Sequence, residues 1–233
     1  MSIKDYKGVL KTSGGTVTQV NHVHGDYYTI KVVPNKELTW TAGEHALFTL
    51  TGAQFKGKKW RAFSLASIPE EGHILLGFRT GTTPSPFKQH LIDNGLNSNI
   101  KIRGPFGPFK LKDNAKPVVL FASGVGITPI RSILKSVEKD KTREVHVVYA
   151  SAQFYLFKDA IDGIVKENPK VHVIYTQSKE EAQGKLTELA LQYKNEAYYY
   201  SSGAGNVIKE TKALLTSHGI EKSNMIDDYF IGY

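Results

Sequence analysis

The chain has 233 residues and a mass of 25.9 kDa, which is enough for one large domain or two small ones. Apolar residues make up 40% of it and charged residues 22%, a composition that is typical of folded globular proteins and excludes a disordered chain. Because the sequence contains no cysteine, it excludes disulfides, thiolate metal sites, iron–sulfur clusters held by this chain and a cysteine nucleophile.

The sequence is basic, since 30 Lys and Arg residues against 22 Asp and Glu residues give a formal net charge of +8. Such a surface attracts phosphates, nucleic acids or acidic proteins, although a solvated lysine-rich surface would carry the same charge. We find no nucleic-acid-binding motif and expect no nucleic-acid partner. Apolar runs such as residues 118–122 are far shorter than the roughly 20 residues of a membrane helix, and the first residues lack a signal-peptide pattern. We therefore expect a cytoplasmic protein without a membrane span.

Up to about residue 112, apolar and polar residues alternate, which is the pattern of half-buried strands. The clearest runs are residues 27–33, 46–50 and 73–78, with glycines and prolines between them. Several short strands separated by turn residues predict an antiparallel β-barrel or sandwich. One short helix is predicted near residues 86–92.

After residue 117 the pattern changes to strands that alternate with helices. Strands are predicted at residues 118–122, 145–149, 171–175 and 197–200. This alternation predicts an open parallel sheet with helices on both faces. The sequence therefore predicts two domains: an antiparallel β-barrel over residues 1–113 and a Rossmann-like parallel-sheet domain over residues 114–233.

Two segments rich in small residues follow strands of the second half. Gly124, Gly126, Thr128 and Pro129 lie between a strand and a helix, where glycine lets the backbone approach a pyrophosphate and a helix N-terminus favours anions. A tight strand-to-helix turn is the alternative. Residues 201–206 follow the fourth strand in the same way, and taken alone they favour an ordinary loop with Asn206 as the helix cap.

Two segments of the first half combine a cation with polar or aromatic groups. Arg61, Phe63 and Ser64 share one strand and offer a guanidinium for a pyrophosphate, a ring for a flat heterocycle and a hydroxyl for its polar atoms. Ser85 precedes a proline and a short helix, so it makes a second anion site that Arg79 could complete. Taken alone, an edge strand and a plain helix cap are the favoured interpretations.

Together, and in this order, these segments resemble the ferredoxin–NADP reductase superfamily. Residues 61–64 look like its R-x-Y-S flavin motif, residues 104–107 like its G-P-x-G segment and residues 124–129 like its G-x-G-x-x-P nucleotide motif. Residues 202–204 occupy the place of the family's C-G-P motif, and residues 228–233 look like its terminal E-x-F-x-G-Y motif. The resemblance covers nearly the whole chain. It implies a barrel that binds FAD, less often FMN, and a second domain that binds NAD(P), with hydride passing between the two cofactors.

Carried onto this sequence, the resemblance also implies residue roles. The residues implied for hydride transfer are Ser64, Ser202, Asp228 and Tyr233. The residues implied for flavin binding are Arg61, Ala62, Phe63, Ser64, Phe78, Arg79, Thr80, Pro84, Ser85 and Tyr233. The residues implied for nucleotide binding are Gly124, Gly126, Thr128, Pro129, Ser178, Lys179, Gly203 and Asn206. The chain departs from the family pattern in having Phe63 for Tyr, Ser202 for Cys and Asp228 for Glu.

The loop after the third strand of the second half bears on the choice of carrier. No carboxylate occurs there before Glu180, whereas NAD sites often offer one to the ribose diol. Ser178 and Lys179 could hold a 2′-phosphate instead, which favours NADPH over NADH. A polar loop that touches nothing is the alternative.

The resulting prediction is an NAD(P)H-dependent flavoprotein reductase that passes electrons to a separate acceptor, such as an acidic ferredoxin or flavodoxin attracted by the positive charge. The alternatives are a reductase of free flavin, quinone or ferric iron, and a non-catalytic flavin- or nucleotide-binding regulatory subunit. We predict no metal site, because His22 and His24 lack a third ligand. His146 and His172 fall in strands that look buried, so we expect both to be core residues.

Overall fold

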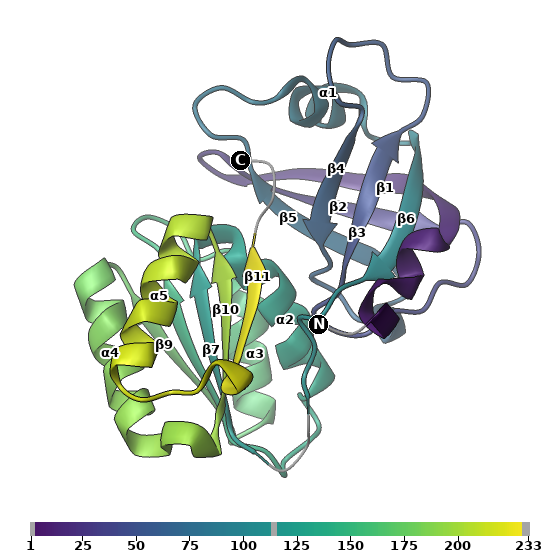
Figure 1. Ribbon diagram of the computed structural model, residues 1–233. Coiled ribbons are helices and arrows are strands. Elements are labelled where there is room, and N and C mark those ends of the chain that lie inside the picture. The colour runs from purple at the N-terminus through teal and green to yellow at the C-terminus, as the bar shows by residue number, and fades with distance from the viewer. Residues whose placement is uncertain (1–2, 113–115, 230–233) are drawn as a thin grey trace. The chain divides into compact units, whose positions relative to one another are not determined.

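The computed structural model describes residues 3–112 and 116–229. They form two compact units, one that ends at Lys110 and one that begins at Leu111. The first unit contains a curled antiparallel sheet, and the second contains a parallel sheet flanked by helices (Figure 1). This confirms the predicted fold class.

Six antiparallel strands build the first unit, in the order β4-β3-β6-β1-β2-β5. Their bounds are β1 Thr12–His24, β2 Tyr27–Pro34, β3 His45–Leu50, β4 Trp60–Ser64, β5 Ile74–Arg79 and β6 Asn99–Phe106. A 3₁₀ helix over Ile3–Leu10 precedes the sheet, and helix α1, Pro86–Asn94, follows β5. The predicted short helix is therefore confirmed, with two further residues at its end.

The core of the first unit follows the alternation of its strands. Ala46, Phe48 and Leu50 on β3 are buried, as are Ile100 and Ile102 on the neighbouring β6. Each of the larger side chains, Phe48, Leu50, Ile100 and Ile102, stabilises the folded unit by about 1.5–3 kcal/mol relative to an exposed position. The core therefore lies on one face of the curled sheet, while the residues between these positions are more exposed.

Five parallel strands build the second unit, in the order β11-β10-β7-β8-β9. Their bounds are β7 Val118–Ser123, β8 Val145–Ala150, β9 Val171–Thr176, β10 Tyr198–Gly203 and β11 Met225–Tyr229. The helices are α2 Ile127–Ser136, α3 Lys158–Glu167, α4 Lys179–Tyr193 and α5 Gly205–Ser217. Strand β11, which carries only two aliphatic residues and two aspartates, is an additional strand beyond the four predicted.

The strand order of the second unit reverses at β7. The chain runs outward from β7 to β8 and β9 on one side, then returns to place β10 and β11 on the other. Open α/β sheets bind ligands at the carboxyl ends of the strands where this reversal occurs. The loops that follow β7 and β10 therefore mark the expected ligand position in this unit.

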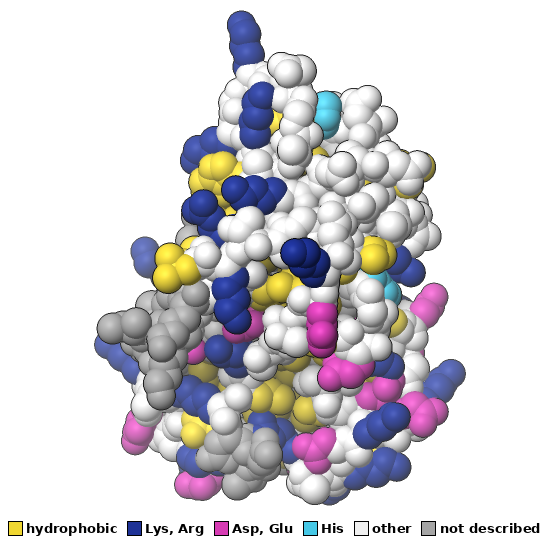
Figure 2. Space-filling view, turned by 90° about the vertical axis from the view of Figure 1, so that its right-hand side faces the viewer, with side chains coloured by type: hydrophobic (Ala, Val, Ile, Leu, Met, Phe, Trp, Pro, Cys, Tyr) yellow, Lys and Arg dark blue, Asp and Glu magenta, His cyan; other side chains and the backbone are white. Residues whose placement is uncertain are grey.

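Lys and Arg side chains stand out across the face shown in Figure 2, in keeping with the net charge of +8. Within the described residues, no helix is both long and apolar enough to cross a bilayer.

Candidate cofactor sites

The loop after β7 forms a close backbone junction with β10. Gly124 has a φ of 54°, a conformation that favours glycine, and it opens a short 3₁₀ turn that leads into α2. A Cβ atom added to Gly126 would lie 2.1 Å from the carbonyl oxygen of Ser202. These glycines therefore have a structural role, in line with the tight-turn alternative, because the turn after β7 passes directly against the backbone of β10.

Thr128 and Pro129 lie in the first turn of α2 and are both buried. The Thr128 hydroxyl donates to the carbonyl oxygen of Val125 at 2.7 Å, which fixes the turn. The N-cap of α2 is Gly126, so no side chain of the N-cap residue bonds to the first turn of this helix.

Ser202 and Asp228, both predicted to flank the reacting carbon, are brought together by the sheet. They are register partners on β10 and β11, and their Oγ and Oδ2 atoms lie 3.5 Å apart. Ser202 has no exposed surface, and Asp228 is 9% exposed. The pair is therefore positioned by buried parallel strands rather than by a mobile loop.

The loop after β10 corrects one sequence interpretation. Helix α5 begins at Gly205 with Ala204 as its N-cap, so Asn206 lies exposed in the first turn and does not cap the helix. Gly203 has a φ of 156°, and a Cβ atom there would lie 3.1 Å from that of Ser123. Small residues at 203 and 204 thus let β10 pass close to β7.

On β4 of the first unit, Phe63 belongs to the core more than to the surface. It is 8% exposed, and its ring centroid lies 5.9 Å from that of Phe48, 5.6 Å from Phe78 and 6.2 Å from Phe87. Phe78, also predicted to bind the cofactor, has no exposed surface, so it packs within the core and offers no surface to a ligand. Ser64 is buried beside Phe63, and Ala62 is partly exposed.

Two cations lie close together beside this aromatic cluster. The Arg61 guanidinium carbon is 5.6 Å from the Phe87 ring centroid, and its Nη1 donates to the backbone oxygens of Trp60 and Lys58 at 2.9 and 3.3 Å. Lys88 is 8% exposed, and burial together with the positive charge of Arg61 lowers its pKa to about 8, against the attraction of Asp26. This local repulsion is what a bound anion would relieve.

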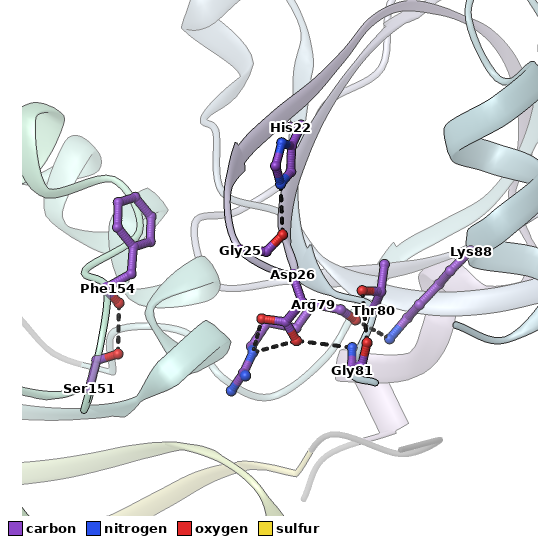
Figure 3. Close-up of polar contacts among 9 residues, drawn as sticks. All are labelled: His22, Gly25, Asp26, Arg79, Thr80, Gly81, Lys88, Ser151 and Phe154. Carbon is purple, nitrogen blue, oxygen red and sulfur yellow. Dashed lines mark hydrogen bonds and ion pairs between the residues drawn. The ribbon is translucent and has the colours of Figure 1, made fainter. Parts of the chain in front are cut away.

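Arg79, predicted to hold a pyrophosphate, is already engaged by a carboxylate. Its Nε lies 2.9 and 3.0 Å from the two oxygens of Asp26 (Figure 3). Asp26 also accepts from the Gly81 amide at 3.0 Å, and the Arg79 guanidinium lies 4.8 Å from the ring centroid of Tyr27. The Thr80 hydroxyl donates to the Gly81 oxygen at 3.1 Å, which closes the turn after β5.

The predicted cap of α1 is confirmed. Ser85 is the N-cap, its Oγ accepts from the Lys88 amide at 3.4 Å, and Pro86 is the first helical residue. Pro84 is partly exposed just before the cap. The side chain of Lys88 returns from the first turn of α1 to donate to the Arg79 oxygen at 2.6 Å (Figure 3). Sequence reasoning missed Lys88, although its place three residues after the cap puts it in the first turn.

The loop after β9 is ordered by its own side chains. Ser178 caps α4, with its Oγ accepting from the Glu181 amide at 3.1 Å, while the Glu181 carboxylate accepts from the Gln177 amide at 3.0 Å. Lys179 pairs with Glu210 on α5 at 2.9 Å, and this carboxylate raises the pKa of the lysine. Glu210 lies far from Lys179 in the sequence, and nothing in its local pattern marks it.

Three further observations concern residues outside the two sites described above. In the second unit, Ser151 donates to the Phe154 oxygen at 2.7 Å and closes the loop after β8 (Figure 3). His172 is exposed and His146 half-buried, so the prediction that both are core residues is wrong. Tyr233 lies outside the described residues.

Comparison with known proteins shows what this chain is similar to. Residues 120–213 match the family model described as "Oxidoreductase NAD-binding domain". The matched residues all lie in the second unit. The CDP-6-deoxy-L-threo-D-glycero-4-hexulose-3-dehydrase reductase of Yersinia pestis is 21% identical over 224 residues, which cover 87% of this chain and 63% of that protein. The chain therefore spans less than two thirds of this relative's length.

Solved structures extend the likeness from the NAD-binding domain to the whole chain. The FAD/NAD-binding domain of a Vibrio cholerae nitric oxide dioxygenase matches with a TM-score of 0.78 and 18% identity, over 94% of this chain and 98% of that one. A Neisseria gonorrhoeae ferredoxin NADP+ reductase, solved with FAD and NADP, matches with a TM-score of 0.77 and 16% identity, over 95% of this chain and 99% of that one. The NAD-binding domain and the curled sheet before it thus have the fold of the ferredoxin–NADP reductase superfamily, and the predicted resemblance is confirmed.

Proposed function

We propose that this chain is an NAD(P)H-dependent flavoprotein reductase, which transfers hydride between NAD(P)H and FAD and passes electrons to a separate acceptor. The observation that carries the proposal is the presence, in one chain, of an NAD-binding domain and the curled sheet of this superfamily. When bound, FAD supplies the redox chemistry, and the protein supplies binding and position. A cytoplasmic location stays a prediction from the sequence.

The first unit offers a donor set that fits the diphosphate of FAD. Arg61 and Lys88 supply two cations whose mutual repulsion a diphosphate would relieve, and the nine-residue helix α1 adds the positive end of its dipole. Ser85 fixes the start of that helix. We assign Arg79 a secondary part, because a phosphate must compete with Asp26 for it. FMN, with its single phosphate, fits the same donors less fully.

In the second unit we assign the nucleotide to the carboxyl edge of β7 and β10. Gly124 and Gly126 form the turn that leads into α2, and the start of that helix favours the pyrophosphate. Asp228 offers a carboxylate for orienting the nicotinamide, and the buried Ser202 hydroxyl positions that carboxylate. Hydride transfer requires donor and acceptor atoms to be held about 3–3.5 Å apart, so rigid strands suit this part.

We further propose that NADPH is preferred to NADH. The 2′-phosphate would take Lys179 from Glu210, a pair whose side chains are 57% and 47% exposed and therefore weakly held. The Ser178 hydroxyl accepts from the Glu181 amide and keeps its own proton to donate to a phosphate.

For the electron acceptor we propose an acidic electron-transfer protein, because a net charge of +8 steers such a partner toward the surface. Turnover with an acidic ferredoxin or flavodoxin should then fall steeply between low and physiological salt. Equal turnover across that range would favour a small acceptor such as free flavin, quinone or ferric iron.

A visible spectrum of the flavin-loaded protein, recorded anaerobically during addition of NADPH or NADH, tests the proposal. We expect the flavin bands to bleach, faster with NADPH. Ser202→Ala should slow bleaching by about tenfold, because it removes the group that meets Asp228, whereas Ser201→Ala, at the adjacent buried position, should not. A protein that takes up no flavin, or a flavin that neither nucleotide bleaches, would refute the reductase assignment.

A further inference from the structure

A cluster of metal-ligating side chains lies at the amino ends of β8 and β9, away from the proposed nucleotide edge. Glu144 immediately precedes β8, and His146 is the second residue of that strand. His172 is the second residue of β9 and the register partner of His146. Because side chains of register partners on neighbouring strands point to the same face, the two imidazoles lie side by side.

The ligand atoms of these three residues all lie within 4.8 Å of one another. His172 Nε2 is 3.1 Å from a Glu144 oxygen, and the two imidazole rings stack with centroids 4.9 Å apart. The His172 side chain is 49% exposed, so an ion can reach the cluster from solvent. Ligands of a Zn²⁺ ion lie about 2.0–2.2 Å from the ion, so the three ligand atoms must move closer together by roughly an ångström to bind it. The exposed His172 ring can make this movement by turning.

The surroundings hold these side chains in place. The Tyr193 hydroxyl lies 2.7 Å from His146 Nε2 and orients its ring. The Lys170 ammonium contacts the Glu144 carboxylate, which also lies within hydrogen-bond distance of His172.

We propose that Glu144, His146 and His172 form a binding site for one divalent transition-metal ion of the Zn²⁺, Ni²⁺ or Cu²⁺ class. Two imidazoles and one carboxylate suit these ions, whereas Mg²⁺ and Ca²⁺ require mostly oxygen ligands. Water would complete the coordination. Lys170 is the natural competitor, because its ammonium occupies the same carboxylate.

This site is separate from the activity proposed above. Parallel strands place their amino ends at the edge of the sheet opposite their carboxyl ends, and the predicted nucleotide residue Gly203 lies at the carboxyl end of β10. An ion bound here would tie β8 to β9, which is the outermost strand, and through His146 would reinforce the end of α4. Its expected effect is stabilisation of the second unit, with no part in hydride transfer.

Calorimetric titration of the untagged full chain with Zn²⁺, and with Mg²⁺ as the comparison ion, tests the proposal. We expect one Zn²⁺ site and no Mg²⁺ binding. His172→Gln, a change at an exposed position, should weaken this site by about tenfold or more. Lys170→Met should tighten it, because the competing ammonium is removed. His218→Gln, in the same unit but outside the cluster, should leave binding unchanged.

Cu²⁺ provides a second readout that depends on the ligands themselves. Its electron paramagnetic resonance spectrum should show hyperfine coupling to two imidazole nitrogens in the unaltered chain and to one in His172→Gln. An unchanged Zn²⁺ isotherm and an unchanged Cu²⁺ spectrum in that variant would overturn the proposal. Equal losses in His172→Gln and His218→Gln would also overturn it, since they would indicate dispersed surface binding.

Discussion

Asp26 holds Arg79 through both of its carboxylate oxygens, at 2.9 and 3.0 Å from the arginine Nε. The Asp26 carboxylate neutralises the charge of Arg79, so this arginine is less available to a bound anion. The positive charge of the first unit that remains near α1 is therefore carried mainly by Arg61 and Lys88. The binding of an anionic cofactor depends on how these three cations and one carboxylate share their charge.

Asp26→Asn should tighten the binding of FAD, because it releases Arg79 and removes a negative charge near Lys88. We expect an affinity gain of about threefold to tenfold and a loss of unfolding free energy of about 1 kcal/mol or less, since the pair is partly exposed. Fluorescence titration with FAD measures the first, and urea unfolding the second. Asp93→Asn, at an exposed carboxylate that contacts Gln89, is the matched control. Weaker FAD binding in Asp26→Asn would contradict the assignment of Arg79.

Binding of FAD at pH 8.5 should be accompanied by uptake of a proton. The pKa of Lys88 is about 8 in the folded chain, so this side chain is partly neutral at that pH, and a bound diphosphate would raise its pKa and charge it. Calorimetry in two buffers of different ionisation enthalpy measures the uptake. Lys88→Met should abolish it, and uptake that persists in this variant would show that another group titrates.

Lys88 should also shape the stability of the FAD-free protein in alkaline solution. Its pKa falls from 10.5 to about 8 on folding, so between these values the unfolded chain binds more protons than the folded one. The free energy of unfolding therefore gains a contribution that rises with pH across this window. Urea midpoints at pH 7.5 and 9.5 should show this rise relative to Lys88→Met. Parallel pH profiles for the two proteins would refute it.

Gly126→Ala should destabilise the second unit, because the new Cβ atom would lie 2.1 Å from the backbone oxygen of Ser202. A backbone atom cannot turn away as a flexible side chain can, so we expect a loss of about 1–3 kcal/mol. Gly163→Ala on α3 is the control, since its Cβ would meet nothing within 4 Å and helix propensity favours alanine. Thermal unfolding compares the two. Equal melting temperatures would mean that the junction with β10 is looser than described.

Glu210→Gln should increase the preference for NADPH over NADH, because it leaves Lys179 to a 2′-phosphate. Lys179→Glu should have the opposite effect, with a loss for NADPH that exceeds the loss for NADH by about tenfold or more. The ratio of kcat/KM values for the two nucleotides measures both changes. Glu188→Gln, which breaks the comparable pair with Lys185, should leave the ratio unchanged. If both nucleotides respond equally, Lys179 does not contact the 2′ position.

The periodic parts of the fold could be predicted from the sequence, and the pairings between distant residues could not. Residues 118–122 show the continuous apolar run of a buried parallel strand, residues 145–149 are rich in β-branched residues, and both are found as strands. Strand β1 went unpredicted over most of its length, because its Ser, Thr and Gly residues carry little hydrophobic signal and it gains stability from β2 and β6 on either side. Strand β11 was missed for a similar reason.

The candidate sites show the same division. The cap at Ser85 and the turn at Gly124 depend on neighbours within a few residues, so local chemistry identified them. The carboxylates that pair with the predicted cations come from distant parts of the sequence. Asp26 pairs with Arg79, and Glu210 pairs with Lys179. Likewise, the exposure of His172 depends on its place on an outermost strand, which apolar neighbours in the sequence conceal.

The central position of β7 has a consequence for synthesis of the chain. This strand pairs with β8, which follows one helix later, and with β10, which follows only after α2, α3 and α4. While the chain emerges from the ribosome, one apolar edge of β7 stays unpaired until nearly all of the second unit has been made. Such long-range pairing slows folding and leaves a partly folded intermediate whose exposed apolar surface is prone to aggregation. Nascent chains arrested before β10 should therefore recruit chaperones, and those arrested after β11 should release them.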